Sequence, residues 1–96
     1  MQCNKGRRGV KMFRIWAKVI KEDKIIMDTV YEGDEAFHIN RLSLYLAEIC
    51  NSFDIETPVI LKKHLEHFYL FNTTTFRGTD FITTPNFDKL VIEHIA

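Results

Sequence analysis

The segment "MFRIWAKVI", residues 12–20, alternates between apolar and polar side chains, and this alternation constrains the fold more than any other feature. Four apolar residues would share one face of an extended chain: Phe13, Ile15, Ala17 and Val19. The other face would carry Trp16 between Arg14 and Lys18. A period of two is typical of a β-strand with one buried face. We therefore predict a strand whose outer face is centred on Trp16.

A polar turn and a second β-rich run follow this strand and predict a hairpin. The letters "KEDK" interrupt the alternation at residues 21–24, and "IIMDTVY" at residues 25–31 is rich in β-forming residues. We expect Ile20 to pair with Ile25 across the turn. The second strand would then return antiparallel to the first.

This register decides which residues of the second strand lie beside Trp16. It places Met27 and Tyr31 on the outer face, with Tyr31 opposite Arg14. It also places Asp28 on the core face, where an unpaired carboxylate is unfavourable. A shift of one residue would exchange the two faces of the second strand.

Two amphipathic helices are predicted in the middle of the chain. The first extends from an N-cap at Asp34 to about Ser52, and the second begins with Thr57 as N-cap and Pro58 as its first helical residue. Apolar residues recur at spacings of three and four in both segments: Leu42, Tyr45, Leu46, Ile49, Cys50 and Phe53, then Ile60, Leu61, Leu65 and Phe68. These stripes are expected to face the core.

The last quarter of the chain is predicted to form an irregular connection and a final strand. Phenylalanines recur every five or six residues and are expected to anchor the Thr-rich connection to the core: Phe71, Phe76, Phe81 and Phe87. The segment "FDKLVIEHI" is apolar on both faces, with Leu90 and Ile92 on one side and Val91 and Ile95 on the other. This pattern favours a strand inside a sheet.

Together these elements predict a small α+β domain. A chain of 96 residues is long enough for one domain, and eight Phe, three Tyr and one Trp provide bulk for its core. The predicted order is β-β-α-α-β, with the three strands in one mostly antiparallel sheet and the two helices packed on it.

The histidines of "VILKKHLEHFYLF" could belong to a metal or acid–base site. His64 and His67 are three residues apart, whereas the helical zinc motif H-E-x-x-H separates its two histidines by four. No second group of ligand residues is near them in the sequence. We therefore interpret both as packed or surface histidines of a helix, and we expect no metal and no other cofactor.

The N-terminal residues have a different charge from the rest of the chain. Residues 1–20 contain six Lys or Arg and no acid, although the whole chain has a net charge of zero. Arg7 and Arg8 can be encoded by AGG-AGG, a ribosome-binding sequence at a suitable distance from Met12. We therefore expect residues 1–11 to be a poorly ordered leader before the native start, and residues 12–96 to form the domain.

The order of three groups of motifs gives the chain a resemblance to known sequences. The motifs are "IWAKVIK" with "KII" and "DTV", then "LAEIC" with "FDIETPVILKKH", then "TTFRGTDF" with "FDKLVIE". From Met12 onward, the chain resembles short bacterial proteins of a family described only as a domain of unknown function. This resemblance implies no activity, cofactor or catalytic residue.

The sequence favours a binding or adaptor domain over an enzyme. It contains no P-loop, no dinucleotide-binding glycine motif and no nucleophile elbow. We expect contacts with a protein partner or a second copy of the chain, made through Arg14, Trp16, Lys18, Met27 and Tyr31. If the two helices cover only the opposite side of the sheet, these residues leave an amphipathic patch open, of the kind enriched at interfaces. The alternative is that one of the helices covers Trp16.

Two alternatives remain open. Basic residues around Trp16 could bind single-stranded nucleic acid by stacking and phosphate contacts. A small metal-dependent enzyme could use His64 and His67, with Glu66, Asp80 and Arg77 as further candidates. No apolar run is long enough to span a membrane, and Cys3 and Cys50 form no disulfide framework, so we expect a cytoplasmic protein.

Overall fold

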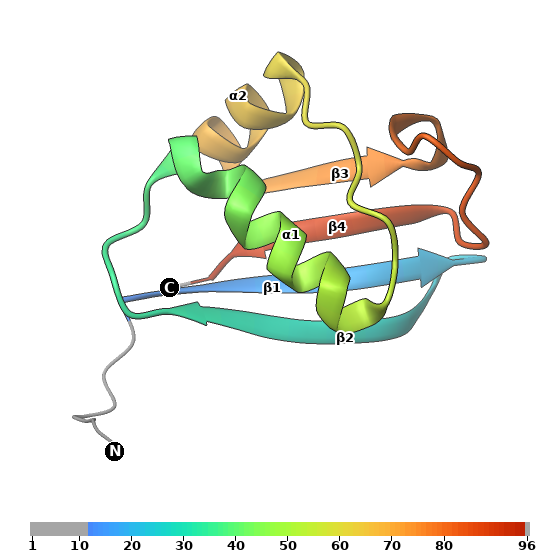
Figure 1. Cartoon of the computed structure of the whole chain (residues 1–96), viewed down its shortest axis with the longest axis horizontal. Helices are drawn as coiled ribbons and strands as arrows, with labels where there is room; N and C mark the ends of the chain where they lie inside the picture. The colour runs from blue at the N-terminus through green and yellow to red at the C-terminus, as the bar shows by residue number, and fades with distance from the viewer. Residues whose placement is uncertain (1–11, 96) are drawn as a thin grey trace.

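The structure of the chain is a computed structural model that describes residues 12–95, which form a small α+β domain. Its elements follow in the order β1 (Phe13–Lys21), β2 (Lys24–Gly33), α1 (Leu42–Phe53), α2 (Lys62–Phe71), β3 (Thr73–Arg77) and β4 (Lys89–His94) (Figure 1). The strands form an antiparallel sheet in the order β2-β1-β4-β3. Both helices lie on one face of this sheet (Figure 1).

The prediction of a three-stranded sheet was wrong, because residues 73–77 form a fourth strand. In β3, Thr74 and Phe76 point to the core and are buried, whereas Thr73, Thr75 and Arg77 alternate with them. Threonine is a good strand former, so the alternation was present in the sequence. The absence of a second apolar residue made this segment resemble an irregular connection.

The hairpin of β1 and β2 forms as predicted, but its register changes along the strands. Ile20 pairs with Ile25 as expected, whereas Val19 pairs with Met27, so Ile26 forms a bulge. All pairs beyond the bulge are shifted by one residue from the prediction. This shift places Asp28 opposite Lys18, away from the core, and removes the unfavourable burial of its carboxylate.

The start of the first helix was predicted too early, since α1 begins at Leu42 after the 3₁₀ turn η1 (Ile39–Arg41). Asp34 does not cap it. The preceding segment bends after β2 and is not helical up to His38. It places the ring of Phe37 among other aromatic rings, 5.4 Å from Phe13 and 5.7 Å from Phe68 between centroids.

The start of the second helix was also predicted too early. Thr57 and Pro58 precede α2, which begins at Lys62. The intervening segment is extended, and the Val59 N–H donates a hydrogen bond to the Asp80 carbonyl over 2.8 Å. A tertiary contact therefore overrides the local helix-start signal of Thr57 and Pro58.

The core lies between the sheet and the two helices. Its strand residues include those predicted from the alternation: Phe13, Ile15, Ala17, Val19, Leu90 and Ile92. Helix α1 contributes its predicted stripe from Leu42 to Cys50, with Phe53 at its margin. Three of the four recurring phenylalanines are buried as expected, but Phe71 is 62% exposed. The final strand, β4, is an interior strand of the sheet, as predicted.

Two predictions concern features outside this core. The predicted leader, residues 1–11, lies outside the described residues. Among residues 12–95, no helix has the length and apolar character needed to cross a membrane.

Candidate functional site

The sheet has one face that neither helix covers, and we call it the open face. It consists of the even-numbered residues of β1 and the residues paired with them in β2 and β4. At its centre lie Arg14, Trp16, Lys18, Val30, Val91 and Glu93. The core residues and both helices are on the opposite side. The predicted residues Arg14, Trp16 and Lys18 therefore share one uncovered surface.

Met27 and Tyr31 do not lie on this surface, so the prediction that they share the outer face with Trp16 was wrong. The register pairs Met27 with Val19 and Tyr31 with Ile15, so both lie on the helix side of the sheet. The Tyr31 hydroxyl donates a hydrogen bond to Glu48 of α1 over 3.1 Å. Burial and this carboxylate raise the pKa of Tyr31.

The side chains of the open face are paired with one another inside the protomer. The Trp16 ring N–H donates a hydrogen bond to Asp28 over 2.9 Å, and the ammonium of Lys18 lies 4.1 Å from the centre of the Trp16 ring. Lys18 also forms an ion pair with Glu93 at 3.4 Å. Both the edge and one face of the indole are therefore engaged.

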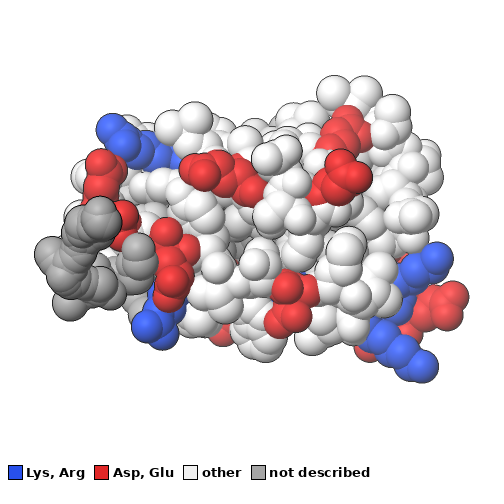
Figure 2. All heavy atoms as spheres, turned by 60° about the horizontal axis from the view of Figure 1, so that its bottom comes forward, with Lys and Arg blue, Asp and Glu red and all other residues white. Residues whose placement is uncertain are grey.

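This pairing bears on the alternative of nucleic-acid binding. Arg14 forms an ion pair with Glu32 at 3.2 Å, so both predicted cations of the open face have acidic partners. A base could stack on the covered side of Trp16 only after Lys18 had moved. On the side of the molecule formed by α1 and β2, acidic side chains are scattered across the middle, and Lys and Arg lie towards the two ends (Figure 2). Figure 2 does not show the open face, and nucleic-acid binding through that face stays a prediction.

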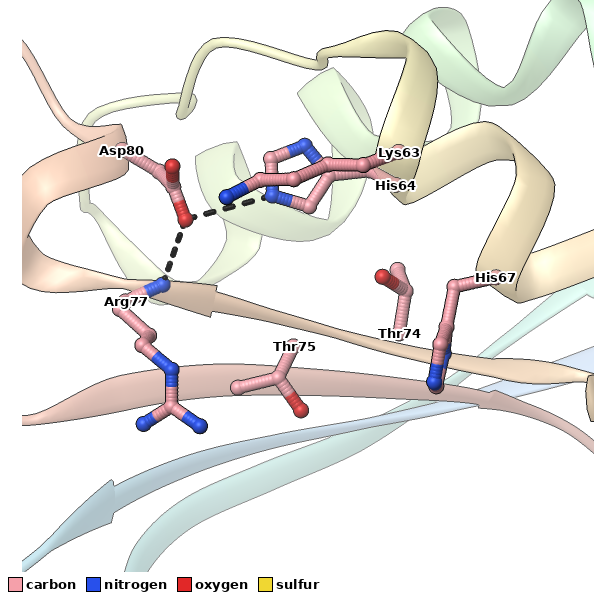
Figure 3. Close-up of a pocket in the computed structure, with 7 residues that line it drawn as sticks. All are labelled: Lys63, His64, His67, Thr74, Thr75, Arg77 and Asp80. Atoms are coloured by element: carbon pink, nitrogen blue, oxygen red, sulfur yellow. Dashed lines mark hydrogen bonds and ion pairs between the residues drawn. The ribbon is translucent and has the colours of Figure 1, made fainter.

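A second candidate site is a groove between α2 and β3. The groove has a volume of about 260 Å³ and is lined by Lys63, His64, His67, Thr74, Thr75, Arg77 and Asp80. Figure 3 shows the first three residues projecting from α2 on one side of β3, with Thr75 and Arg77 on the other. The fold thus brings together four of the five residues considered for an enzyme, whereas Glu66 is not among the lining residues.

His64 is buried, and both of its ring nitrogens have partners. Nδ1 accepts a hydrogen bond from the Leu61 N–H over 2.9 Å. The ring proton of the neutral imidazole is therefore on Nε2, which donates to Asp80 Oδ2 over 3.3 Å. The His64 and Asp80 side chains are only 3% and 9% exposed, and the imidazole lies 4.5 Å from the Phe76 ring between centroids. Neither ring nitrogen is therefore open to a substrate. We interpret His64 as a structural residue that links the start of α2 to Asp80.

Asp80 completes this link through the short 3₁₀ turn η2 (Gly78–Asp80). Its Oδ2 accepts a second hydrogen bond from the Arg77 N–H over 2.9 Å (Figure 3). The carboxylate therefore joins the end of β3 to the first turn of α2. The bond to Arg77 is local, because Asp80 is the third residue of η2 and a polar side chain at this position often bonds back to the N-cap residue. The contact of Asp80 with His64 has no such local signal.

His67 is exposed and has a different arrangement. Its Nδ1 lies 2.7 Å from the Thr73 carbonyl oxygen, which can only accept, so Nδ1 carries the proton in the neutral ring. Its Nε2 is then an unprotonated acceptor. Within residues 12–95, however, no group of three or more His, Cys, Asp or Glu side chains could hold a metal ion.

Cys50 of α1 is the buried thiol predicted from the helical stripe. Burial raises its pKa to about 11, although a hydrogen bond with Thr57 acts in the opposite direction. The thiol is therefore protonated at neutral pH and is a poor nucleophile.

Comparison with known proteins finds no matching family model, no similar curated protein and no similar solved structure. The resemblance to short bacterial proteins stays a prediction. The fold defines a two-layer α+β domain with one open sheet face.

Proposed function

We propose that this protein is a binding domain that associates with a second copy of itself through the open face. The observation that carries this proposal is the location of Trp16 and several aliphatic residues on a sheet face that neither helix covers. Val30, directly opposite Trp16 in the sheet, is 46% exposed, and Ile25 and Ile95 lie farther along the same face with similar exposure. Packing two such faces together would remove these side chains from water.

The pattern of charge on the open face supports a second copy as the partner. Arg14 and Lys18 are neutralised by Glu32 and Glu93 within one protomer. Two identical faces can therefore approach without a large like-charge repulsion, and a two-fold axis would bring the same residues of both copies together. A strongly acidic or basic partner would have to compete with these internal pairs.

The size of the open face limits the strength of the association. Strand β1 has nine residues, and the sheet is four strands wide. With about 3.3 Å per residue and about 4.8 Å between strands, the face covers roughly 500 Å² in each copy. This area is below the roughly 800 Å² per partner of a standard stable interface. We therefore expect a reversible dimer with a dissociation constant in the micromolar range.

The chain has a single Trp, which makes the test direct. Trp16 fluorescence and sedimentation equilibrium would be followed over a wide range of protein concentrations. We expect the Trp16 emission to shift to shorter wavelength as the average mass rises from that of one copy towards that of two.

Two substitutions locate the interface. Val30→Glu introduces a charge beside Trp16 and should abolish self-association, whereas Leu44→Glu, at a residue of α1 that is 60% exposed, should have no effect. A protein that stays monomeric at about millimolar concentration, or a dimer that Val30→Glu does not weaken, would refute the proposal.

A further inference from the structure

The groove between α2 and β3 lies at a free edge of the sheet. Strand β3 is the last strand in the order β2-β1-β4-β3, so only one of its edges is paired. Exposed strand edges can accept an additional strand from another chain, which supplies main-chain hydrogen bonds. Whether β3 can do so depends on which of its backbone groups point outward and are still unoccupied.

The pairing of β3 with β4 identifies these outward groups. The His94 N–H donates to the Asn72 carbonyl over 2.7 Å, which makes His94 and Asn72 a hydrogen-bonded pair of the antiparallel ladder. Because such pairs alternate and β3 contains no bulge, Thr74 and Phe76 bond to β4. The backbone groups of Thr73, Thr75 and Arg77 therefore point to the free edge.

Two known contacts agree with this assignment and define the open part of the edge. The Thr73 carbonyl accepts from His67, and the Arg77 N–H donates to Asp80, so both groups point away from β4. His67 and Asp80 thereby occupy one backbone group at each end. Thr75 lies between them, with an outward N–H and an outward carbonyl that have no backbone or side-chain partner among the described residues.

The charge beside this free segment is positive. Lys63 and Arg77 line the groove, and both are exposed. The one carboxylate among the lining residues, that of Asp80, already accepts hydrogen bonds from His64 and from the Arg77 backbone. Lys63 extends towards Asp80 in Figure 3, and the guanidinium of Arg77 points away from it. Two permanent cations against one engaged carboxylate favour an anionic ligand.

We propose that an acidic peptide segment binds this groove as an added strand beside β3. The peptide would exchange two main-chain hydrogen bonds with Thr75. The peptide residue opposite Thr75 would project its side chain to the same side as Arg77, and the next residue would project towards Lys63 on α2. The site therefore recognises two consecutive acidic residues in an extended segment.

The volume of the groove agrees with this type of ligand. At about 260 Å³ it is smaller than the roughly 300–1,000 Å³ typical of pockets for small molecules. A shallow groove along a strand edge suits an extended chain, whose backbone supplies affinity and whose alternate side chains supply specificity. Because two main-chain hydrogen bonds and two exposed ion pairs contribute little net free energy, we expect weak binding, with a dissociation constant of about 1 mM.

The test uses a synthetic hexapeptide, acetyl-Thr-Val-Glu-Glu-Val-Thr-amide, and amide chemical shifts of the ¹⁵N-labelled protein. We expect a large shift of the Thr75 amide signal on titration and slower hydrogen exchange of the Thr75 N–H. The same peptide with N-methyl groups on both glutamates cannot donate from these residues and should bind at least fivefold more weakly. A Lys-Lys version of the peptide should not bind.

Matched variants separate the charge contribution from the contribution of the strand edge. Lys63→Gln and Arg77→Gln should each weaken peptide binding about threefold. Lys62→Gln, next to Lys63 on α2 but not among the lining residues, should leave binding unchanged.

Three results would overturn the proposal. The first is an unperturbed Thr75 amide at millimolar peptide. The second is equal binding of the N-methylated peptide, which would leave only charge attraction. The third is free glutamate or inorganic phosphate binding as tightly as the peptide, which would identify a simple anion site.

Discussion

Replacement of His64 by alanine should destabilise the domain strongly, although the residue is outside the main apolar core. The substitution removes the acceptor for the Leu61 N–H, a helix-capping hydrogen bond of about 1 kcal/mol. It removes the donor to the Asp80 carboxylate, which at 3.3 Å is near the lower end of about 1.5–3 kcal/mol for bonds to charged groups. The lost packing against Phe76 adds about 1 kcal/mol.

The expected total is about 3–4 kcal/mol, a large part of the roughly 5–15 kcal/mol that stabilises a small domain. Urea unfolding followed by circular dichroism would measure it, and the melting temperature should fall by roughly 15–25 °C. His64→Gln should lose about half as much, because a glutamine at the third helical position can still bond back to the Leu61 N–H.

His67→Ala is the matched control, since His67 is on the same helix and is exposed. It loses one hydrogen bond to the Thr73 carbonyl and should cost less than about 1 kcal/mol. If His64→Ala cost no more than this control, His64 would not be the structural residue that links α2 to Asp80. A zinc ion that remains bound through purification and disappears in the His64 variant would show a metal role instead.

Three further predictions concern the hairpin and α1. Glu22 has a positive φ of 53° in the turn between β1 and β2, so Glu22→Asn should raise the free energy of unfolding by about 1 kcal/mol in urea titrations; an unchanged midpoint would contradict this account. A Cβ atom at Gly33 would overlap the Phe13 ring, so Gly33→Ala should lower the melting temperature and cost about 1–3 kcal/mol, whereas a neutral effect would show that the ring can move freely. The pKa of Cys50 is raised from 9.0 to about 11 in the folded state, so stability should decrease as the pH rises through this interval, and Cys50→Val should remove that part of the decrease. Equal alkaline profiles of the two proteins would exclude Cys50 as its source.

The sequence predicted best those features that depend on periodicity. The alternation from Phe13 to Val19 and the stripe from Leu42 to Cys50 correspond directly to buried faces. Both patterns follow from the geometry of a single strand or a single helix. Burial of the apolar side then stabilises that same strand or helix. The interior position of β4 followed from its two apolar faces in the same way.

Features that depend on distant contacts were not predictable from local patterns. The signal of Thr57 and Pro58 for a helix start is genuine, but the bond from Val59 to Asp80 holds that segment extended. The bulge at Ile26 cannot be inferred from composition, although the carboxylate of Asp28 on the predicted core face was a clue. Such a conflict between register and polarity is a reason to consider a shifted pairing.

The candidate site illustrates the same limit. Two histidines three residues apart gave no indication that one is buried and the other exposed. The difference arises because Asp80 approaches from a turn 16 residues later and bonds to His64 alone. The groove beside β3 could not be predicted, since β3 itself was interpreted as an irregular connection.

The bulge at Ile26 has a consequence for the behaviour of the protein at high concentration. The other outermost strand, β2, carries the exposed aliphatic side chains of Ile25, Ile26 and Met27 next to its unpaired edge. A regular strand of this composition would be a template for endless sheet growth into fibrils. The extra residue shifts the backbone hydrogen-bonding groups on one side of Ile26 relative to those on the other side. A regular incoming strand could therefore pair with only one half of β2. We therefore expect the bulge in β2 to disfavour the addition of further strands at this edge.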